Sequence, residues 1–61
     1  MSKIATRRRE AGLTQQGLAD ALGVTQAAVA NWENGRRCPP VKTLRKVAEA
    51  LGCTIAELID G

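Results

Sequence analysis

Four glycines, at positions 12, 23, 35 and 52, divide this chain into short segments and so limit what it can fold into. The segments between them carry apolar residues at helical spacing, and no stretch alternates with a period of two. Glycine commonly follows the last turn of a helix, where it adopts the left-handed conformation. We therefore expect short helices that end at glycines, and no strands.

These patterns predict an all-α fold with five short helices around one core. Thr14 is a good N-cap for the second segment, and Thr54 and Glu57 form a capping box for the fifth. The fourth segment has the clearest amphipathic pattern of the chain. Gly17, inside the second segment, indicates either a close backbone approach or simple tolerance. The predicted segments are 2–11, 15–22, 26–34, 41–51 and 54–60.

The length of 61 residues allows one domain, residues 1–61, with no room for a cleft between subdomains. The chain has no His, no nucleophile beside a base and no phosphate-cradling loop, so an enzyme is not expected. We expect no cofactor and no small-molecule ligand. The longest apolar stretches are a few residues, which excludes a membrane span, and no signal-peptide run follows Met1. A cytoplasmic protein is the expectation.

Nine basic residues exceed six acidic ones and give a net charge of +3. The basic residues fall into two blocks without acids, separated by an almost neutral centre. This layout suits a polyanion that is held at two places beside a neutral reading element. Two solvated helix faces would give the same pattern, and charge alone does not decide between them. The blocks are Lys3, Arg7, Arg8 and Arg9, and Arg36, Arg37, Lys42, Arg45 and Lys46.

Cys38 and Cys53 are the two cysteines of the chain. Without His and without a C-x-x-C pattern, we expect no zinc site within one chain. Cys53 lies in an apolar stretch and is expected to pack as a small hydrophobic residue. Cys38 lies beside Pro39 in a loop and is expected to be an exposed thiol. A disulfide between two subunits through Cys38 stays open as an alternative.

A helix-turn-helix is predicted at about residues 14–34. The second and third segments are joined by residues 23–25 alone, and so short a connector forces a sharp corner. Ala19 is small enough for the two helices to approach closely. Val29 and Trp32 are the large apolar residues that hold the third segment against the core. Packing of Trp32 is favoured over stacking on a sugar-phosphate backbone.

The other side of the third segment carries Gln26, Ala27, Ala30 and Asn31. A thin helix of this kind fits the major groove of DNA, which is about 12 Å wide. Gln and Asn can each form two hydrogen bonds to adenine, and an Ala methyl can contact the methyl of thymine. Gln26 lies in the first turn, where recognition helices usually meet base edges. The alternative is that Gln26 and Asn31 are ordinary surface amides.

The stretch GLTQQGLADALGVTQAAVANWENG, residues 12–35, resembles the helix-turn-helix of lambdoid phage repressors and Cro proteins, and of XRE-type bacterial regulators more widely. The likeness continues through RRCPPVKTLRKVAEALGCTIAELI, residues 36–59. It rests on L-T-Q-x-x-L-A, G-V, W-E-N-G and A-x-x-L-G in this order and spacing. The chain departs from this pattern at four positions. Ala27 places an apolar residue among the base readers, and the other three departures are Gly17, Cys38 and Pro40.

The resemblance implies roles for particular residues. Base contacts would come from Thr25, Gln26, Ala27 and Asn31. Gln15 would contact phosphate and support Gln26. Further phosphate contacts, through side chains and backbone amides, would come from Asn34, Arg36 and Arg37. The same family often forms dimers through its last helices, here Pro40, Val41, Ile55, Glu57 and Leu58.

The remaining charges are assigned as follows. By the resemblance, Arg8 would form an ion pair with Glu33 that ties the first helix to the end of the third. Arg7 and Arg9 would then be the freer charges of the first block. Lys42 lies close enough to the loop to reach a phosphate, whereas a solvated face is expected for Arg45 and Lys46.

The function predicted from these features is a sequence-specific, DNA-binding transcriptional regulator. Two copies on successive major grooves of double-stranded DNA, about 34 Å apart, would need a near-palindromic operator. Such a homodimer would most simply repress by occupying its operator. The alternative is an antitoxin or protein-interaction module with the same fold, which would show a tight protein partner and no measurable DNA affinity.

Overall fold

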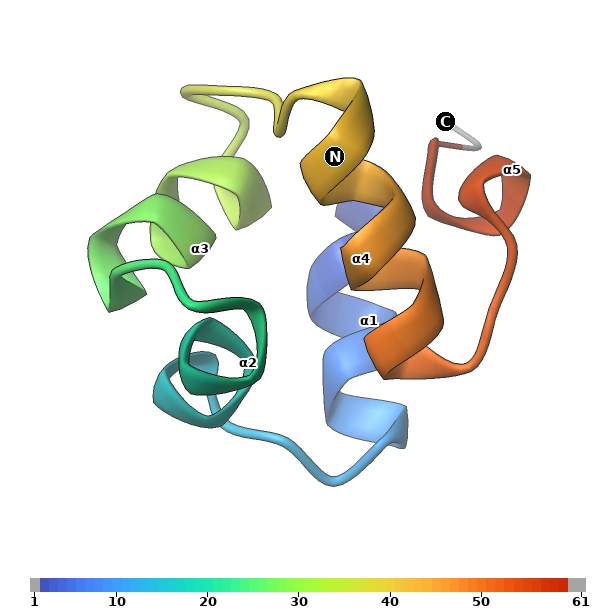
Figure 1. Cartoon of the computed structure of the whole chain (residues 1–61), viewed down its shortest axis with the longest axis horizontal. Helices are drawn as coiled ribbons and strands as arrows, with labels where there is room; N and C mark the ends of the chain where they lie inside the picture. The colour runs from blue at the N-terminus through green and yellow to red at the C-terminus, as the bar shows by residue number, and fades with distance from the viewer. Residues whose placement is uncertain (1, 60–61) are drawn as a thin grey trace.

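The computed structural model describes residues 2–59, and this part of the chain is built from five helices without a strand (Figure 1). The all-α prediction is confirmed, and the boundaries agree closely with the predicted segments. The predicted fifth segment also included Asp60, which lies outside the described residues. No helix within residues 2–59 is long and apolar enough to cross a lipid bilayer. The helices are α1 (Ser2–Glu10), α2 (Gln15–Leu22), α3 (Gln26–Glu33), α4 (Val41–Leu51) and α5 (Ile55–Ile59).

The helix starts follow from local hydrogen bonds of three threonines. The hydroxyl oxygens of Thr14 and Thr25 accept backbone N–H groups in the first turns of α2 and α3. At α5 the capping box is confirmed, because Thr54 N–H donates to the Glu57 carboxylate and Glu57 N–H donates to the Thr54 hydroxyl. Pro40 stands at the start of α4 and provides no side-chain cap. The cap residues therefore fix most helix starts locally.

The core receives one large, fully buried side chain from each helix. In Figure 1, α1 and α4 lie in the middle, α2 and α3 on the left, and α5 on the right. Helix α1 packs against α3, α4 and α5, while α2 packs against α3 and α4. The five side chains that join these helices are Ile4, Leu18, Val29, Val47 and Leu58. Further buried apolar residues around them are Ala19, Leu22, Trp32, Leu44 and Ala48.

Gly17 lies in the first turn of α2, beside the residue that caps this helix. A Cβ atom at this position would lie 3.2 Å from the hydroxyl oxygen of Thr14 and 3.7 Å from a methyl of Leu13. The same hydroxyl oxygen accepts the N–H of Gly17 at 2.9 Å. A side chain here would need a shift of a few tenths of an ångström at the cap of α2. The neighbouring atoms belong to side chains, so the structure shows no close backbone approach at Gly17.

Replacing Gly23 by Ala is expected to lower the free energy of unfolding by about 1–2 kcal/mol, the cost of a left-handed conformation for a residue with a Cβ. Gly23 has a φ of +70° at the end of α2, and no atom lies within 4 Å of a Cβ built there. The cost is therefore conformational and not steric. Urea unfolding of Gly23→Ala and Gly23→Asn checks this, because Asn tolerates this conformation better. Equal losses in both variants would contradict it.

Candidate nucleic-acid interface

The turn between α2 and α3 sets the direction of α3. Gly23 ends α2 by donating its N–H to the carbonyls of Ala19 and Asp20. Val24 N–H also donates to the Ala19 carbonyl, at 3.0 Å. Ala19 is fully buried, so its small side chain lies where the two helices meet. The result is that α3 packs on α2 and α1 and lies at the edge of the molecule (Figure 1).

The two sides of α3 differ as the sequence predicted. Val29 is fully buried and Trp32 is 5% exposed, so both belong to the core and the predicted packing of Trp32 is confirmed. Gln26 and Ala27 are exposed, and Asn31 is half-buried. Neither amide lies inside the core. The outer side of α3 therefore offers polar groups and a methyl group to a molecule that approaches from outside.

Thr25 combines a structural role with an exposed position. Its hydroxyl oxygen accepts the N–H of Ala28 at 3.1 Å, which caps α3. A hydroxyl that accepts one hydrogen bond still has its own hydrogen to donate. Thr25 therefore retains a donor at the entrance of the helix, next to Gln26.

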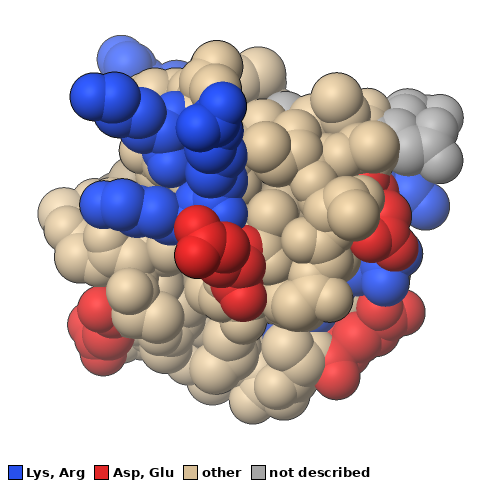
Figure 2. Space-filling model, turned by 45° about the vertical axis from the view of Figure 1, so that its right-hand side comes forward, with Lys and Arg blue, Asp and Glu red and all other residues tan. Residues whose placement is uncertain are grey.

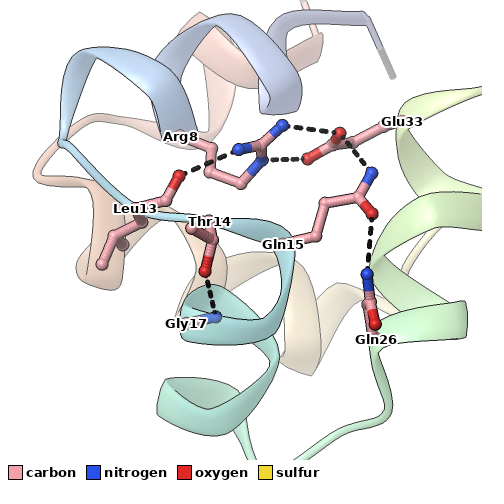
Figure 3. A network of polar contacts seen from close by, with 7 residues as sticks. All are labelled: Arg8, Leu13, Thr14, Gln15, Gly17, Gln26 and Glu33. Atoms are coloured by element: carbon pink, nitrogen blue, oxygen red, sulfur yellow. Dashed lines mark hydrogen bonds and ion pairs between the residues drawn. The ribbon is translucent and has the colours of Figure 1, made fainter.

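A chain of polar contacts runs from the buried Arg8 of α1 to Gln26 at the exposed start of α3 (Figure 3). Arg8 binds Glu33 through two hydrogen bonds, Nε to Oε2 at 2.6 Å and Nη2 to Oε1 at 3.2 Å. Its remaining terminal nitrogen donates to the carbonyl of Leu13 at 2.9 Å. Gln15 Nε2 donates to Glu33 Oε1 at 3.0 Å, and Gln26 Nε2 donates to Gln15 Oε1 at 3.4 Å. Figure 3 shows Gln15 between Glu33 and Gln26.

The ion pair between Arg8 and Glu33 is buried, with side chains 10% and 8% exposed. Arg8 therefore has no access to DNA and joins α1 to the end of α3. The resemblance to lambdoid repressors implied this pair, whereas the hydrogen bond from Gln15 to Glu33 was not foreseen. No sequence pattern reports it, because the two residues lie on different helices that only the packing brings together.

The pKa of Glu33 lies below its ordinary value of 4.5. Burial is the largest influence and on its own raises this pKa. Hydrogen bonds from Arg8 and Gln15, together with the nearby positive charges of Arg8 and Arg9, outweigh it. The carboxylate is therefore ionised at neutral pH and can only accept hydrogen bonds.

The lowered pKa of Glu33 predicts that acid destabilises the protein. The stabilisation by this carboxylate is fully present above its ordinary pKa of 4.5 and is lost as the pH falls through the lower folded value. Unfolding free energies measured from pH 7 to pH 3 should stay level at first and decline below about pH 4.5. The variant Arg8→Met/Glu33→Leu lacks the group and should decline less. Identical profiles for the two proteins would contradict this origin.

The loop after α3 uses its own backbone amides. The N–H groups of Arg36 and Arg37 both donate to the carbonyl of Asn31, at 3.0 and 3.2 Å. Arg36 N–H also donates to Asn34 Oδ1 at 3.0 Å, and Asn34 N–H donates to the carbonyl of Ala30. The expected phosphate contacts through these amides do not fit this arrangement, because the amides already have acceptors. The side chains of Arg36 and Arg37 are exposed.

Exposed basic side chains extend from this loop to α4. Figure 2 shows Lys and Arg side chains gathered in one corner of the face it presents. On α4 the spacing of three and four residues places three of these groups on one side of the helix. The exposed basic residues of the second block are Arg36, Arg37, Lys42, Arg45 and Lys46.

Arg7 is not a free charge, which corrects the expectation from the sequence. Its guanidinium binds the carboxylate of Glu57 at 2.8 Å and lies 3.6 Å from that of Glu10. Arg7 therefore connects α1 to the start of α5 and is engaged there. Arg9 is exposed and, within residues 2–59, has no ion-pair partner.

Leu58 does not fit the expected dimer interface. It is fully buried between α5 and the rest of the core, so it presents no surface to a second copy. A helix of five residues buries only one side, and that side carries Leu58. Ile59 is 52% exposed and Val41 is 67% exposed. Of the other expected interface residues, Pro40 and Glu57 are exposed, and Ile55 is half-buried against the core.

The two cysteines differ in their exposure to solvent. Cys38 is a free, exposed thiol in the loop before α4, and Cys53 is half-buried against the core, as predicted. Within residues 2–59, no three or more His, Cys, Asp or Glu side chains are arranged to hold a metal ion.

Comparison with known proteins identifies the same helix-turn-helix. A family model described as helix-turn-helix matches residues 4–58. The uncharacterized HTH-type transcriptional regulator y4dJ of Sinorhizobium fredii is 43% identical over 58 residues, which cover 95% of this chain and 75% of that protein. The transcriptional activator BcrR of Enterococcus faecalis is 34% identical over 59 residues, which cover 97% of this chain but 29% of BcrR.

A phage protein is also similar. The transcriptional repressor RstR of the cryptic phage CTXphi of Vibrio cholerae is 36% identical over 59 residues, covering 97% of this chain and 53% of RstR. The matched region of each relative spans the two helices of the turn motif and the helices around them. The family model is described by its helix-turn-helix, and the three relatives are named as a transcriptional regulator, an activator and a repressor. The chain therefore belongs to the helix-turn-helix family of transcriptional regulators.

Proposed function

We propose that this protein is a sequence-specific regulator that acts in the cytoplasm, binds a near-palindromic operator as a homodimer and represses by occupying it. The observation that carries the proposal is the outer side of α3. It exposes Gln26 and Ala27, leaves Asn31 half-buried and keeps its bulky residues in the core. A helix with such a side can enter the major groove, where Gln and Asn recognise adenine.

Base contacts are assigned to Thr25, Gln26, Ala27 and Asn31. Ala27 contributes a methyl contact to thymine, since it has no polar group to offer. Phosphates are bound by exposed or half-buried side chains of residues that precede and follow α3 in the chain. These phosphate contacts supply most of the affinity and make it depend on salt. The phosphate-binding residues are Gln15, Asn34, Arg36, Arg37 and Lys42.

A homodimer would contact more base pairs than a monomer, and this favours a dimer in the proposal. One recognition helix contacts only a few base pairs, whereas two copies on successive major grooves, about 34 Å apart, double the contacts. Val41 and Ile59 expose apolar surface on α4 and α5, where the family often pairs. With Leu58 buried, the remaining expected residues of this interface are Pro40, Val41, Ile55 and Glu57, and we add the exposed Ile59.

Repression is the simpler of two modes of action. The relatives include both an activator and a repressor by name, and the chain spans 29% of the first and 53% of the second. Occupying an operator needs no further contact with the transcription machinery, whereas activation does. A reporter gene placed behind the selected operator distinguishes them, because repression lowers its output and activation raises it.

Selection of bound sequences from random double-stranded DNA tests the proposal. We expect a site with two half-sites in inverted orientation, with centres one helical turn apart or a multiple of it. A single half-site would reject the dimer. Binding without any enriched sequence would reject specific recognition and would favour a role in protein binding.

Replacing Arg36 by Ala should weaken binding to every DNA sequence by a similar factor. The exposed guanidinium lies in the loop directly after α3, where it meets phosphate and not bases. The slope of log affinity against log salt should fall by about 1 for each phosphate that the variant no longer neutralises. Titrations at several salt concentrations measure this. Arg45→Ala removes the same charge from the solvated side of α4 and serves as control, and an equal change in slope would contradict the assigned role of Arg36.

A further inference from the structure

The contact chain in Figure 3 has a direction that follows from one charged group. Glu33 is ionised, so its oxygens can only accept hydrogen bonds. Gln15 must therefore turn its NH2 group toward Glu33, as observed at 3.0 Å. An amide carries its oxygen and its nitrogen on opposite arms, so the Gln15 oxygen points away from the carboxylate. That oxygen is the one that meets Gln26.

The same constraint passes to Gln26. Its neighbour Gln15 offers an oxygen, so Gln26 must present its NH2 group, as observed at 3.4 Å. One of the two amide hydrogens of Gln26 is used in this way. Its carbonyl oxygen and its second hydrogen are left for an outside partner. One acceptor and one donor match adenine, which offers the donor N6 and the acceptor N7, but not guanine, which offers two acceptors.

We propose that Glu33, held in place by Arg8, is a positioning residue that makes Gln26 prefer adenine over guanine. The carboxylate touches no base. It fixes the direction of the two amides and keeps one hydrogen of Gln26 away from the DNA. Without it, both hydrogens of Gln26 are free to donate, and N7 and O6 of guanine become acceptable partners. This inference rests on the proposed function of α3 as a base reader.

Three variants test the positioning role. Arg8→Met/Glu33→Leu replaces the buried ion pair by apolar residues, a change that proteins often tolerate without loss of stability. Gln15→Met keeps the ion pair and interrupts the contact chain one step further along. Gln16→Met is the matched control, because it makes the same substitution at an exposed position of α2, where the Gln16 amide donates to Asp20 and takes no part in the contact chain. Circular dichroism verifies that each variant is folded.

The measurement is the ratio of affinities for two duplexes that differ in one base pair. The operator is first selected with the wild-type protein, and the position read by Gln26 is the one whose preference disappears in Gln26→Ala. Adenine and guanine are then compared at this position, together with a scrambled duplex. Both test variants should lower the adenine-to-guanine ratio about tenfold, the order of one bidentate contact, while the control keeps it.

The possible results distinguish the positioning role of Glu33 from the proposed function of α3. A reduced ratio in both test variants, with an unchanged ratio in the control, supports the positioning role, because a purely structural role would weaken both duplexes equally. An unchanged ratio in the test variants overturns it, as does a wild-type preference for guanine at this position. A wild-type protein without any base preference would overturn the proposed function and the positioning role with it.

Discussion

Replacing Gln26 by Ala should abolish the base preference at one position in each half-site while leaving non-specific binding in place. Each bidentate contact between Gln and adenine is worth about 1–3 kcal/mol, so a dimer on two half-sites should lose about 2–6 kcal/mol of specific binding free energy. Affinity for a scrambled duplex should stay nearly constant, because Gln26 carries no charge. Titrations of both duplexes at one salt concentration measure the two quantities.

Gln16→Ala is the matched control for this experiment. Gln16 is exposed on α2, where its amide donates to Asp20 at 2.8 Å instead of taking part in the contact chain. The same change of side chain at this position should leave the specific affinity unaltered. Equal losses of specific and scrambled binding in Gln26→Ala would show that this residue supports affinity and reads no base.

Replacing Arg8 alone by Met should destabilise the protein by about 3–5 kcal/mol, because it leaves the Glu33 carboxylate buried without its counter-charge. Glu33 is 8% exposed, so water cannot replace the missing guanidinium easily. The hydrogen bond to the Leu13 carbonyl is removed as well. Small domains lie at the low end of the usual range of about 5–15 kcal/mol, so the urea midpoint should approach zero.

The double variant Arg8→Met/Glu33→Leu separates the charge from the packing. If the destabilisation of Arg8→Met comes from the unpaired carboxylate, removing Glu33 as well should restore most of the stability. A double variant as unstable as Arg8→Met would show that the packing of the arginine stem, and not the charge, holds α1 to α3.

Local signals predicted the helices of this chain well. Thr14 and Thr25 cap helices that begin where the sequence indicates, and Gly23 ends α2 with a positive φ. These features depend on a few neighbouring residues, which is why a sequence reports them. The inward position of Val29 and Trp32 was also predictable, since their spacing of three places them on one side of a helix.

Contacts between residues far apart in the sequence were harder to predict. The pair Arg7–Glu57 joins residues 50 positions apart, and no local pattern reports it. Leu58 was expected in a dimer interface because the resemblance implied pairing through the last helices, whereas the structure buries it fully. The backbone amides of Arg36 and Arg37 were expected, by the resemblance, among the phosphate contacts, but both donate to the carbonyl of Asn31. Each of these features depends on how the helices pack, which spacing alone does not determine.

A double-mutant cycle between Gln26 and one atom of the DNA tests whether the outer side of α3 reads base edges. The adenine read by Gln26 is replaced by 7-deazaadenine, which lacks only the N7 acceptor, and both duplexes are bound to wild-type protein and to Gln26→Ala. If the outer side of α3 faces base edges, the modified base should weaken the wild-type complex and leave the Gln26→Ala complex unchanged, with a coupling of about 0.5–1.5 kcal/mol per half-site, the value of one hydrogen bond. Equal weakening of both complexes, and hence no coupling, would contradict the account.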